Sequence, residues 1–122
     1  MVGSGGFVGT LARYVLSGVV QREFPLSAFP YGTLVVNLMG CFAIGVLAGI
    51  SECRQLFSPE LRLFVFVGVL GGFTTFSTFG YETIVLVRDA ELLPAFVNVG
   101  LHVVAALSLV WLGFAIASWR FA

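Results

Sequence analysis

Four long apolar runs, separated by short polar breaks, constrain this sequence more than any other feature. They cover about residues 2–20, 31–50, 61–87 and 94–119. Each run is close to the ~20 residues that a helix needs to cross about 30 Å of hydrocarbon. Only 10% of the 122 residues are charged, against roughly one quarter in a soluble domain. We therefore predict an all-α integral membrane protein, with four transmembrane helices in one domain, residues 1–122.

The few charged residues argue against a nucleic-acid partner and say little about orientation. All six basic residues are arginines, and six acidic residues balance them. No basic cluster is present to replace counterions on phosphate, so no nucleic acid is expected. With four spans, one side of the membrane carries Arg22 and Arg88, and the other carries Arg54, Arg62 and Arg120. This near-balance, which also arises by chance in small proteins, is a first hint of an antiparallel dimer.

Glycines spaced four residues apart recur in the apolar runs. The pairs are Gly5 and Gly9, Gly45 and Gly49, and Gly68 and Gly72. Such pairs let helices approach closely in lipid, either within one subunit or between two. A bundle of four spans has little interior, so we expect a transport path to require more than one subunit.

Polar side chains inside the apolar runs are the candidates for function, because each must find a partner or line water. They are Arg13, Asn37, the hydroxyl residues between Thr74 and Thr78, Glu82, Asn98 and His102. The sequence has no Ser, His and Asp set with nucleophile spacing, no phosphate-binding loop and no cluster of metal-ligating side chains. An enzyme is therefore not expected.

The stretch GGFTTFSTFGYE, residues 71–82, makes a poor helix interior. Glycine costs about 1 kcal/mol relative to alanine in a helix, and threonine competes for backbone hydrogen bonds. We therefore predict a break near residues 71–75, whose freed carbonyls would resemble the cation sites of broken-helix transporters. The alternative is a continuous, glycine-kinked helix whose hydroxyls bond back to its own carbonyls.

Donor groups near this stretch favour an anion pathway. Asn37 offers amide donors, and Thr33 lies one turn earlier on the same helix face, so the two extend a polar track. Phe76 and Phe79 also share a face, and the edge of a phenyl ring attracts an anion. Each residue has an ordinary interpretation as well: a helix–helix hydrogen bond for Asn37, and lipid contact or core packing for the phenylalanines.

Three segments give the chain a resemblance to a known family. They are GGFVGTLARY at residues 5–14, NLMG at residues 37–40 and, above all, GVLGGFTTFSTFGYE at residues 68–82. These segments resemble those of the small fluoride channels of the Fluc (CrcB) type, and the resemblance extends over all four apolar runs. It implies passive, selective export of fluoride across the lipid of a prokaryotic inner membrane. It also implies a dual-topology, antiparallel homodimer with two pores.

The resemblance implies roles for residues of the pore. Asn37 would be the amide that faces fluoride, and Phe76 and Phe79 would line the path as an aromatic box. The matching polar stretch contributes the hydroxyls of Thr75, Ser77 and Thr78. Of these hydroxyls, we expect that of Thr78 in the pore.

The resemblance also implies an ion that does not move. The backbone carbonyls of Gly71 and Thr74 would hold a central, structural sodium ion shared by both subunits. Arg13 matches the arginine near the end of the family's first span, and is expected at a vestibule or packing site.

The fourth run and the end of the third leave roles open. Asn98 and His102 face one way, and His102 is either a pore-lining donor or a satisfied intramembrane histidine. Ala105 and Ala106 follow, so a hydroxyl expected one turn later on this face is missing. Glu82 either caps the emerging helix end or serves as a vestibule group.

Two other functions fit a small four-span chain. A proton-coupled multidrug exporter needs a carboxylate inside the membrane. The first run offers Arg13 and no acid, which leaves Glu82 as the candidate carboxylate. The other alternative is a non-transporting membrane subunit that uses its glycine pairs for assembly.

Overall fold

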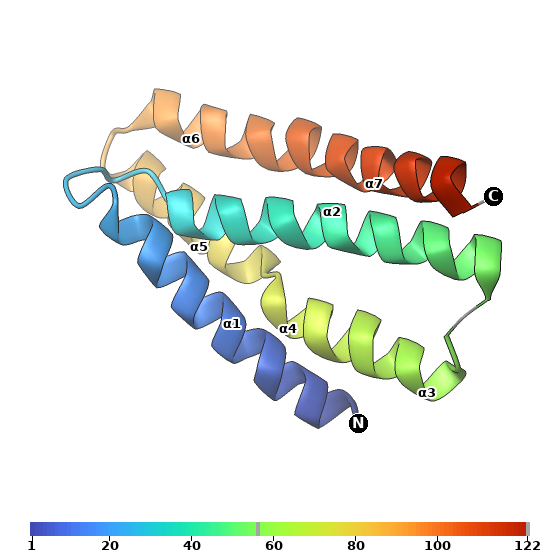
Figure 1. Ribbon diagram of the computed structural model, residues 1–122. Coiled ribbons are helices and arrows are strands. Elements are labelled where there is room, and N and C mark those ends of the chain that lie inside the picture. The colour runs from blue at the N-terminus through green and yellow to red at the C-terminus, as the bar shows by residue number, and fades with distance from the viewer. Residues whose placement is uncertain (56, 122) are drawn as a thin grey trace.

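The computed structural model describes residues 1–55 and 57–121, and the regular secondary structure in these ranges is helical. Helix α1 covers Val2–Arg22 and α2 covers Tyr31–Arg54. A third long stretch, Pro59–Arg88, and a fourth, Leu92–Phe121, each consist of several helical segments. Figure 1 shows both chain ends on the side opposite the loop between α1 and α2. The prediction of an all-α chain with long helices is confirmed.

The third and fourth stretches both depart from regular α-helical geometry. The third comprises α3 (Pro59–Arg62), the π-helical segment η1 (Leu63–Leu70), α4 (Gly71–Phe73) and α5 (Phe76–Arg88). The fourth comprises α6 (Leu92–Gly100), the π-helical segment η2 (Leu101–Ala105) and α7 (Ala106–Phe121). The π-helical segments were not predicted from the sequence.

Glycines bring helices of the same chain into close contact. A Cβ on Gly5 would lie 2.6 Å from the Phe64 carbonyl oxygen, so only glycine allows α1 to pack this closely on η1. Gly45 and Gly49 likewise let α2 pack on α7, which is the most extensive helix–helix contact in the described ranges. Of the two interpretations of the glycine pairs, packing within one subunit is confirmed for these glycines.

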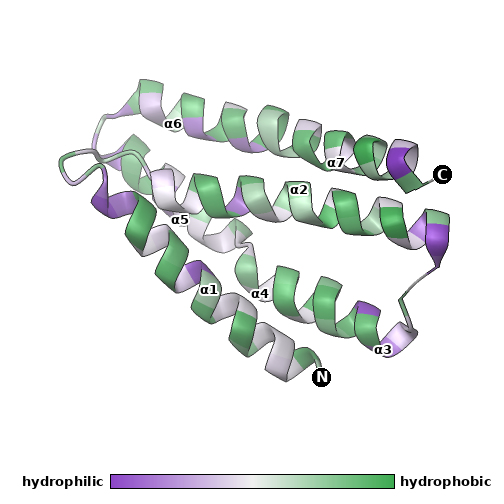
Figure 2. Cartoon of the chain, in the orientation of Figure 1, coloured by the Kyte–Doolittle hydropathy of each residue, from purple (hydrophilic) through white to green (hydrophobic). Residues whose placement is uncertain are grey.

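Three of the long helices are long and apolar enough to cross a membrane: α2, Pro59–Arg88 and Leu92–Phe121. Helix α1 is less apolar because glycines, serines and Arg13 interrupt its hydrophobic residues, as the mixed colours along it show (Figure 2). Large side chains such as Trp119, which is 84% exposed, cover much of the outer surface. Such a surface is stable in lipid rather than in water. The crossing of the membrane by α1 stays a prediction.

Candidate functional site

The third long stretch breaks between α4 and α5, within the predicted region. Thr74 and Thr75 have extended backbones, with φ and ψ of −91° and 158° for Thr74 and −152° and 118° for Thr75. Gly71 and Gly72 remain helical, so the break follows the glycines instead of lying on them. The broken helix is confirmed, and the alternative of a continuous kinked helix is wrong.

Asn37 of α2 pairs with both backbone polar groups of Thr75. The Thr75 N–H donates to Asn37 Oδ1 at 2.9 Å, and Asn37 Nδ2 donates to the Thr75 carbonyl at 3.0 Å. The amide orientation is thereby fixed, since exchanging its oxygen and nitrogen would place donor against donor. Asn37 is buried, with 7% of its surface exposed. Its side chain therefore holds the extended segment against α2.

The same amide nitrogen also faces His102 of η2. Asn37 Nδ2 lies 3.0 Å from His102 Nε2, and His102 Nδ1 lies 3.0 Å from the Asn98 carbonyl oxygen. Because a carbonyl can only accept, Nδ1 carries the hydrogen and Nε2 accepts from Asn37. One neutral tautomer satisfies both contacts. His102 is thus a hydrogen-bonded histidine here, and its role as a pore donor stays a prediction.

Thr75 caps the start of α5. Its Oγ1 accepts from the Thr78 N–H at 3.2 Å and donates to the Thr78 hydroxyl at 3.1 Å. The Ser77 hydroxyl lies 3.4 Å from the same oxygen. A threonine at this position satisfies an N–H that the first helical turn leaves free. The predicted hydroxyls of Thr75, Ser77 and Thr78 therefore gather at the first turn of α5.

Arg13 reaches the break from α1. Its Nε donates to the Gly72 carbonyl at 3.1 Å, and the side chain is partly buried. In a continuous helix that carbonyl would accept from the N–H of Phe76, which here lies beyond the break. The contact shows Arg13 packing against the break, and a role in a vestibule stays a prediction.

Two N–H groups near the break are diverted away from the carbonyls of Gly71 and Thr74. In a continuous α-helix each N–H bonds to the carbonyl four residues earlier. Here the Thr75 N–H bonds to Asn37 in place of Gly71, and the Thr78 N–H bonds to the Thr75 hydroxyl in place of Thr74. In broken-helix transporters, carbonyls released in this way coordinate the coupling ions, sodium among them. The geometry fits the predicted sodium site, and the ion itself stays a prediction.

A groove of about 380 Å³ lies beside the break. Its lining includes five predicted pore residues: Asn37, Thr75, Phe76, Phe79 and His102. Phe79 is buried, and its ring centroid lies 4.1 Å from that of His102. Phe76 is 82% exposed, with its ring centroid 5.3 Å from that of Phe79. The structure therefore brings these predicted residues together in one groove.

Thr33 and Glu82 lie apart from this groove. Both line a cavity of about 580 Å³, which the loop between α1 and α2 helps to form. The Thr33 hydroxyl donates to the Glu82 carboxylate. Thr33 precedes Asn37 by one helical turn on the same face of α2. Polar groups thus continue along α2 from the cavity at Glu82 to the groove at Asn37.

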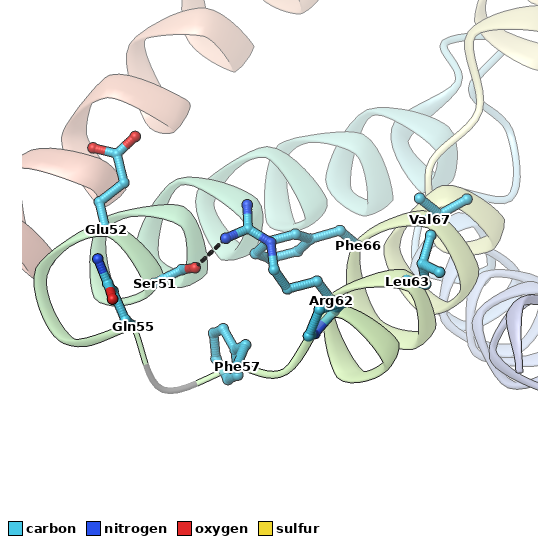
Figure 3. A pocket seen from close by; sticks show the side chains of 9 residues that line it. Ser51, Glu52, Gln55, Phe57, Arg62, Leu63, Phe66 and Val67 are labelled. Atoms are coloured by element: carbon cyan, nitrogen blue, oxygen red, sulfur yellow. Dashed lines mark hydrogen bonds between the residues drawn. The ribbon is translucent and has the colours of Figure 1, made fainter.

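A larger cavity, of about 960 Å³, lies at the turn between α2 and α3 (Figure 3). Arg62 Nη1 donates to Ser51 Oγ at 2.7 Å there, and the guanidinium lies 5.4 Å from the centre of the Phe66 ring. The described residues that line this cavity include none of the predicted site residues. The cavity therefore lies outside the polar track.

The sequence did not reveal the link between Asn98 and Thr83. Asn98 is fully buried, and its Nδ2 donates to Thr83 Oγ1 at 2.9 Å. The Thr83 hydroxyl donates in turn to the Phe79 carbonyl at 2.8 Å. This chain of bonds holds α6 against α5 beside Phe79. A polar Asn98 in an apolar run was the available signal, but nothing in the sequence named its partner.

Comparison with known proteins relates most of the chain to one family. Residues 1–114 match the family described as CrcB-like protein, Camphor Resistance (CrcB). A protein from Geobacter sp. (strain M21), named fluoride-specific ion channel FluC, is 50% identical over 112 residues, which cover 92% of this chain and 90% of that protein. A protein of the same name from Methylobacillus flagellatus is 44% identical over 114 residues, covering 93% and 89%. The fluoride-specific ion channel FluC 3 of Methanosarcina barkeri is 43% identical over 117 residues, covering 96% and 87%. The chain belongs to the CrcB family.

Proposed function

We propose that this protein is a fluoride-selective passive channel, which exports fluoride from the cytoplasm and so reduces its toxicity. Its family is one of ion channels and not of enzymes, and relatives that are 43% to 50% identical bear the name fluoride-specific ion channel. The observation that carries the proposal is the groove beside the break, which combines an amide, hydroxyls and phenyl rings. Fluoride is small and strongly hydrated, so a selective path must replace its water with several small donors.

The proposed path follows α2 from the cavity at Thr33 and Glu82 to the groove at Asn37. Glu82 would act at the vestibule. The edges of Phe76 and Phe79 and the hydroxyl of Thr78 would then meet the ion. Because Asn37 is already bonded to its neighbours, fluoride would take the N–H that now faces His102.

A second copy in the opposite orientation completes the path in this proposal. Phe76, which lines the groove, is 82% exposed in one chain, and Gly71, in the helical turn before the break, is exposed as well. Lipid can cover the apolar ring, but the polar groups of the groove beside it need protein or water at membrane depth, and a partner chain would supply that cover. The near-balance of arginines supports dual insertion into the inner membrane of a prokaryote, with α1 also spanning it. Two-fold symmetry would then give two equivalent pores per homodimer.

The carbonyls of Gly71 and Thr74 from both copies would hold one central sodium ion. When bound, the ion supplies a fixed positive charge that the four carbonyl dipoles share, and so joins the subunits. The released carbonyls support this assignment, since side chains hold their helical donors elsewhere. A structural sodium ion has no need to move with fluoride.

Liposomes loaded with fluoride and containing the purified protein test the function. A passive channel releases fluoride, measured with a fluoride electrode, once a potassium ionophore allows charge to balance. A proton-coupled exporter releases it only with a proton gradient, which would contradict the proposal. Release of chloride as fast as fluoride would contradict selectivity. Protein that never conducts fluoride would support the non-transporting membrane subunit.

A further inference from the structure

We propose that Asn37 and the Thr75 hydroxyl are positioning residues for the cation site, because they keep the carbonyls of Gly71 and Thr74 free. This inference rests on the sodium ion proposed above. It gives Asn37 a role at the break that is separate from its role as a pore amide. At the break, Oδ1 and one hydrogen of Nδ2 bond to Thr75, whereas the pore role uses the other hydrogen of Nδ2, which faces His102.

Asn37 compensates for the hydrogen bond that Thr75 loses on leaving the helix. Backbone groups without partners are costly in a membrane, so the Thr75 N–H would otherwise return to the Gly71 carbonyl and rewind the helix. Asn37 Oδ1 accepts this N–H at 2.9 Å, and Nδ2 satisfies the Thr75 carbonyl at 3.0 Å. Thr75 therefore stays extended with both groups paired. The Gly71 carbonyl is left available to a cation.

The Thr75 hydroxyl keeps a second carbonyl, that of Thr74, without its helical donor. By accepting the Thr78 N–H at 3.2 Å, it removes the donor that would otherwise pair with the Thr74 carbonyl. Arg13 takes the Gly72 carbonyl, which lies between the two released ones, so that carbonyl does not compete for the ion. Side chains thus determine which of the Gly71, Gly72 and Thr74 carbonyls remain free.

Sodium-dependent stability of the purified full-length protein in detergent tests this inference. The midpoint of thermal unfolding is measured over a sodium series, with N-methylglucamine keeping ionic strength constant. The wild-type midpoint is expected to rise with sodium. Thr75→Val keeps the branched shape suited to an extended backbone but lacks the hydroxyl, and should need at least about tenfold more sodium for half of the rise. Thr75→Ser restores the hydroxyl and should stay within about twofold of wild type.

Thr83→Val is the matched control on the same helix. It removes a hydroxyl that bonds to Asn98 and to the Phe79 carbonyl, away from the break. Its midpoint should fall at every sodium concentration, while the concentration for half of the rise stays within about twofold of wild type. Asn37→Ala removes the partner that α2 provides to Thr75. It should raise the sodium concentration for half of the rise, as Thr75→Val does. This second variant keeps the test decisive if Thr75→Val does not fold.

The outcomes separate this inference from the proposed ion. If the unfolding midpoint of the wild-type protein does not change with sodium, both the sodium site and this inference are overturned. A wild-type protein that responds, together with a Thr75→Val or Asn37→Ala protein that responds at the same concentrations, would overturn the inference alone. If the Thr83→Val control needed as much more sodium as Thr75→Val, the effect would be general destabilisation. That result would also overturn the inference.

Discussion

The third and fourth long stretches, Pro59–Arg88 and Leu92–Phe121, have the same length of 30 residues, but only the third breaks. Each contains a π-helical segment, η1 in the third and η2 in the fourth. The fourth continues through η2 into α7 as a helix. The third becomes extended at Thr74 and Thr75. A departure from α-helical geometry therefore does not by itself produce a break.

The difference lies in which groups of each stretch bond to the side chains of other helices. In the fourth stretch, the partners on other helices meet side-chain atoms: Asn98 Nδ2 donates to Thr83, and His102 Nε2 accepts from Asn37, so no backbone bond of this stretch is replaced. In the third, Asn37 and Arg13 arrive from α2 and α1 and replace backbone bonds that the break removes. The comparison teaches that the break depends on partners from other helices as well as on local sequence.

Among the changes that test this difference between the two stretches, Asn37→Ala should have the largest effect. It leaves the N–H and carbonyl of Thr75 without partners, at a cost of about 1–3 kcal/mol for each group. We expect fluoride efflux from liposomes to fall about 100-fold, as measured with a fluoride electrode. The matched change in the fourth stretch is Asn98→Ala, which removes one side-chain bond and should lower efflux by less than about fivefold. Equal losses would contradict a larger role for the Asn37 bonds than for the Asn98 bond.

The two glycines of α4 separate packing within one chain from packing against a partner. A Cβ on Gly72 would lie 2.7 Å from the Gly6 carbonyl oxygen, whereas one on Gly71 would lie 3.8 Å from the nearest such atom, the Phe66 carbonyl oxygen. Gly72→Ala should therefore lower the unfolding free energy by about 1–3 kcal/mol. Gly71→Leu should leave each chain folded and reduce the fraction of cross-linked dimer. A Gly71→Leu protein with a normal dimer fraction would argue against a partner at this face.

His102 in the fourth stretch should show a smaller effect. His102→Phe keeps a ring beside Phe79 but removes the acceptor for the Asn37 N–H, and we expect efflux to fall about tenfold. His102→Gln offers both an acceptor and a donor and should lose less. The two variants are compared by measuring their fluoride efflux under steady-state conditions at neutral pH. Equal activity of the phenylalanine variant and wild type would remove His102 from the path.

Much of the fold could be predicted because it depends on local composition. The apolar runs gave the long helices, and α2 extends past the predicted residue 50 to Arg54 because no glycine or proline stops it there. The break near residues 71–75 was predicted from poor helix formers. Its actual position at Thr74 and Thr75 depends on where Asn37 lies in space, which composition does not specify.

Part of the candidate site could also be predicted from local composition. Asn37, Phe79 and His102 stood out because polar or paired aromatic groups are unusual inside apolar runs, and they do share a groove. That the Asn37 amide is already bonded to Thr75 and His102 could not be predicted, because these bonds connect residues 38 and 65 positions away. Long-range hydrogen bonds depend on the packing of whole helices.

The smallest expected effect concerns the turn that joins the two compared stretches. Ala90 follows α5 with a φ of 61°, in the left-handed region. Its N–H bonds to the Val87 carbonyl at 3.1 Å, and the Glu91 N–H bonds to the Leu86 carbonyl at 2.8 Å. These two bonds form a Schellman motif, in which glycine usually occupies the left-handed position.

Ala90→Gly should therefore raise the unfolding free energy by about 0.5–1 kcal/mol, because glycine removes the strain of a left-handed Cβ but is more flexible when unfolded. The thermal midpoint in detergent should rise by about 2–4 °C, and fluoride efflux should not change. Ala90→Val, with a branched side chain at the same φ, should lower the midpoint and likewise leave efflux unchanged. If either change altered efflux, the conformation of the turn at Ala90 would affect the groove. The two stretches could then no longer be treated as independent elements.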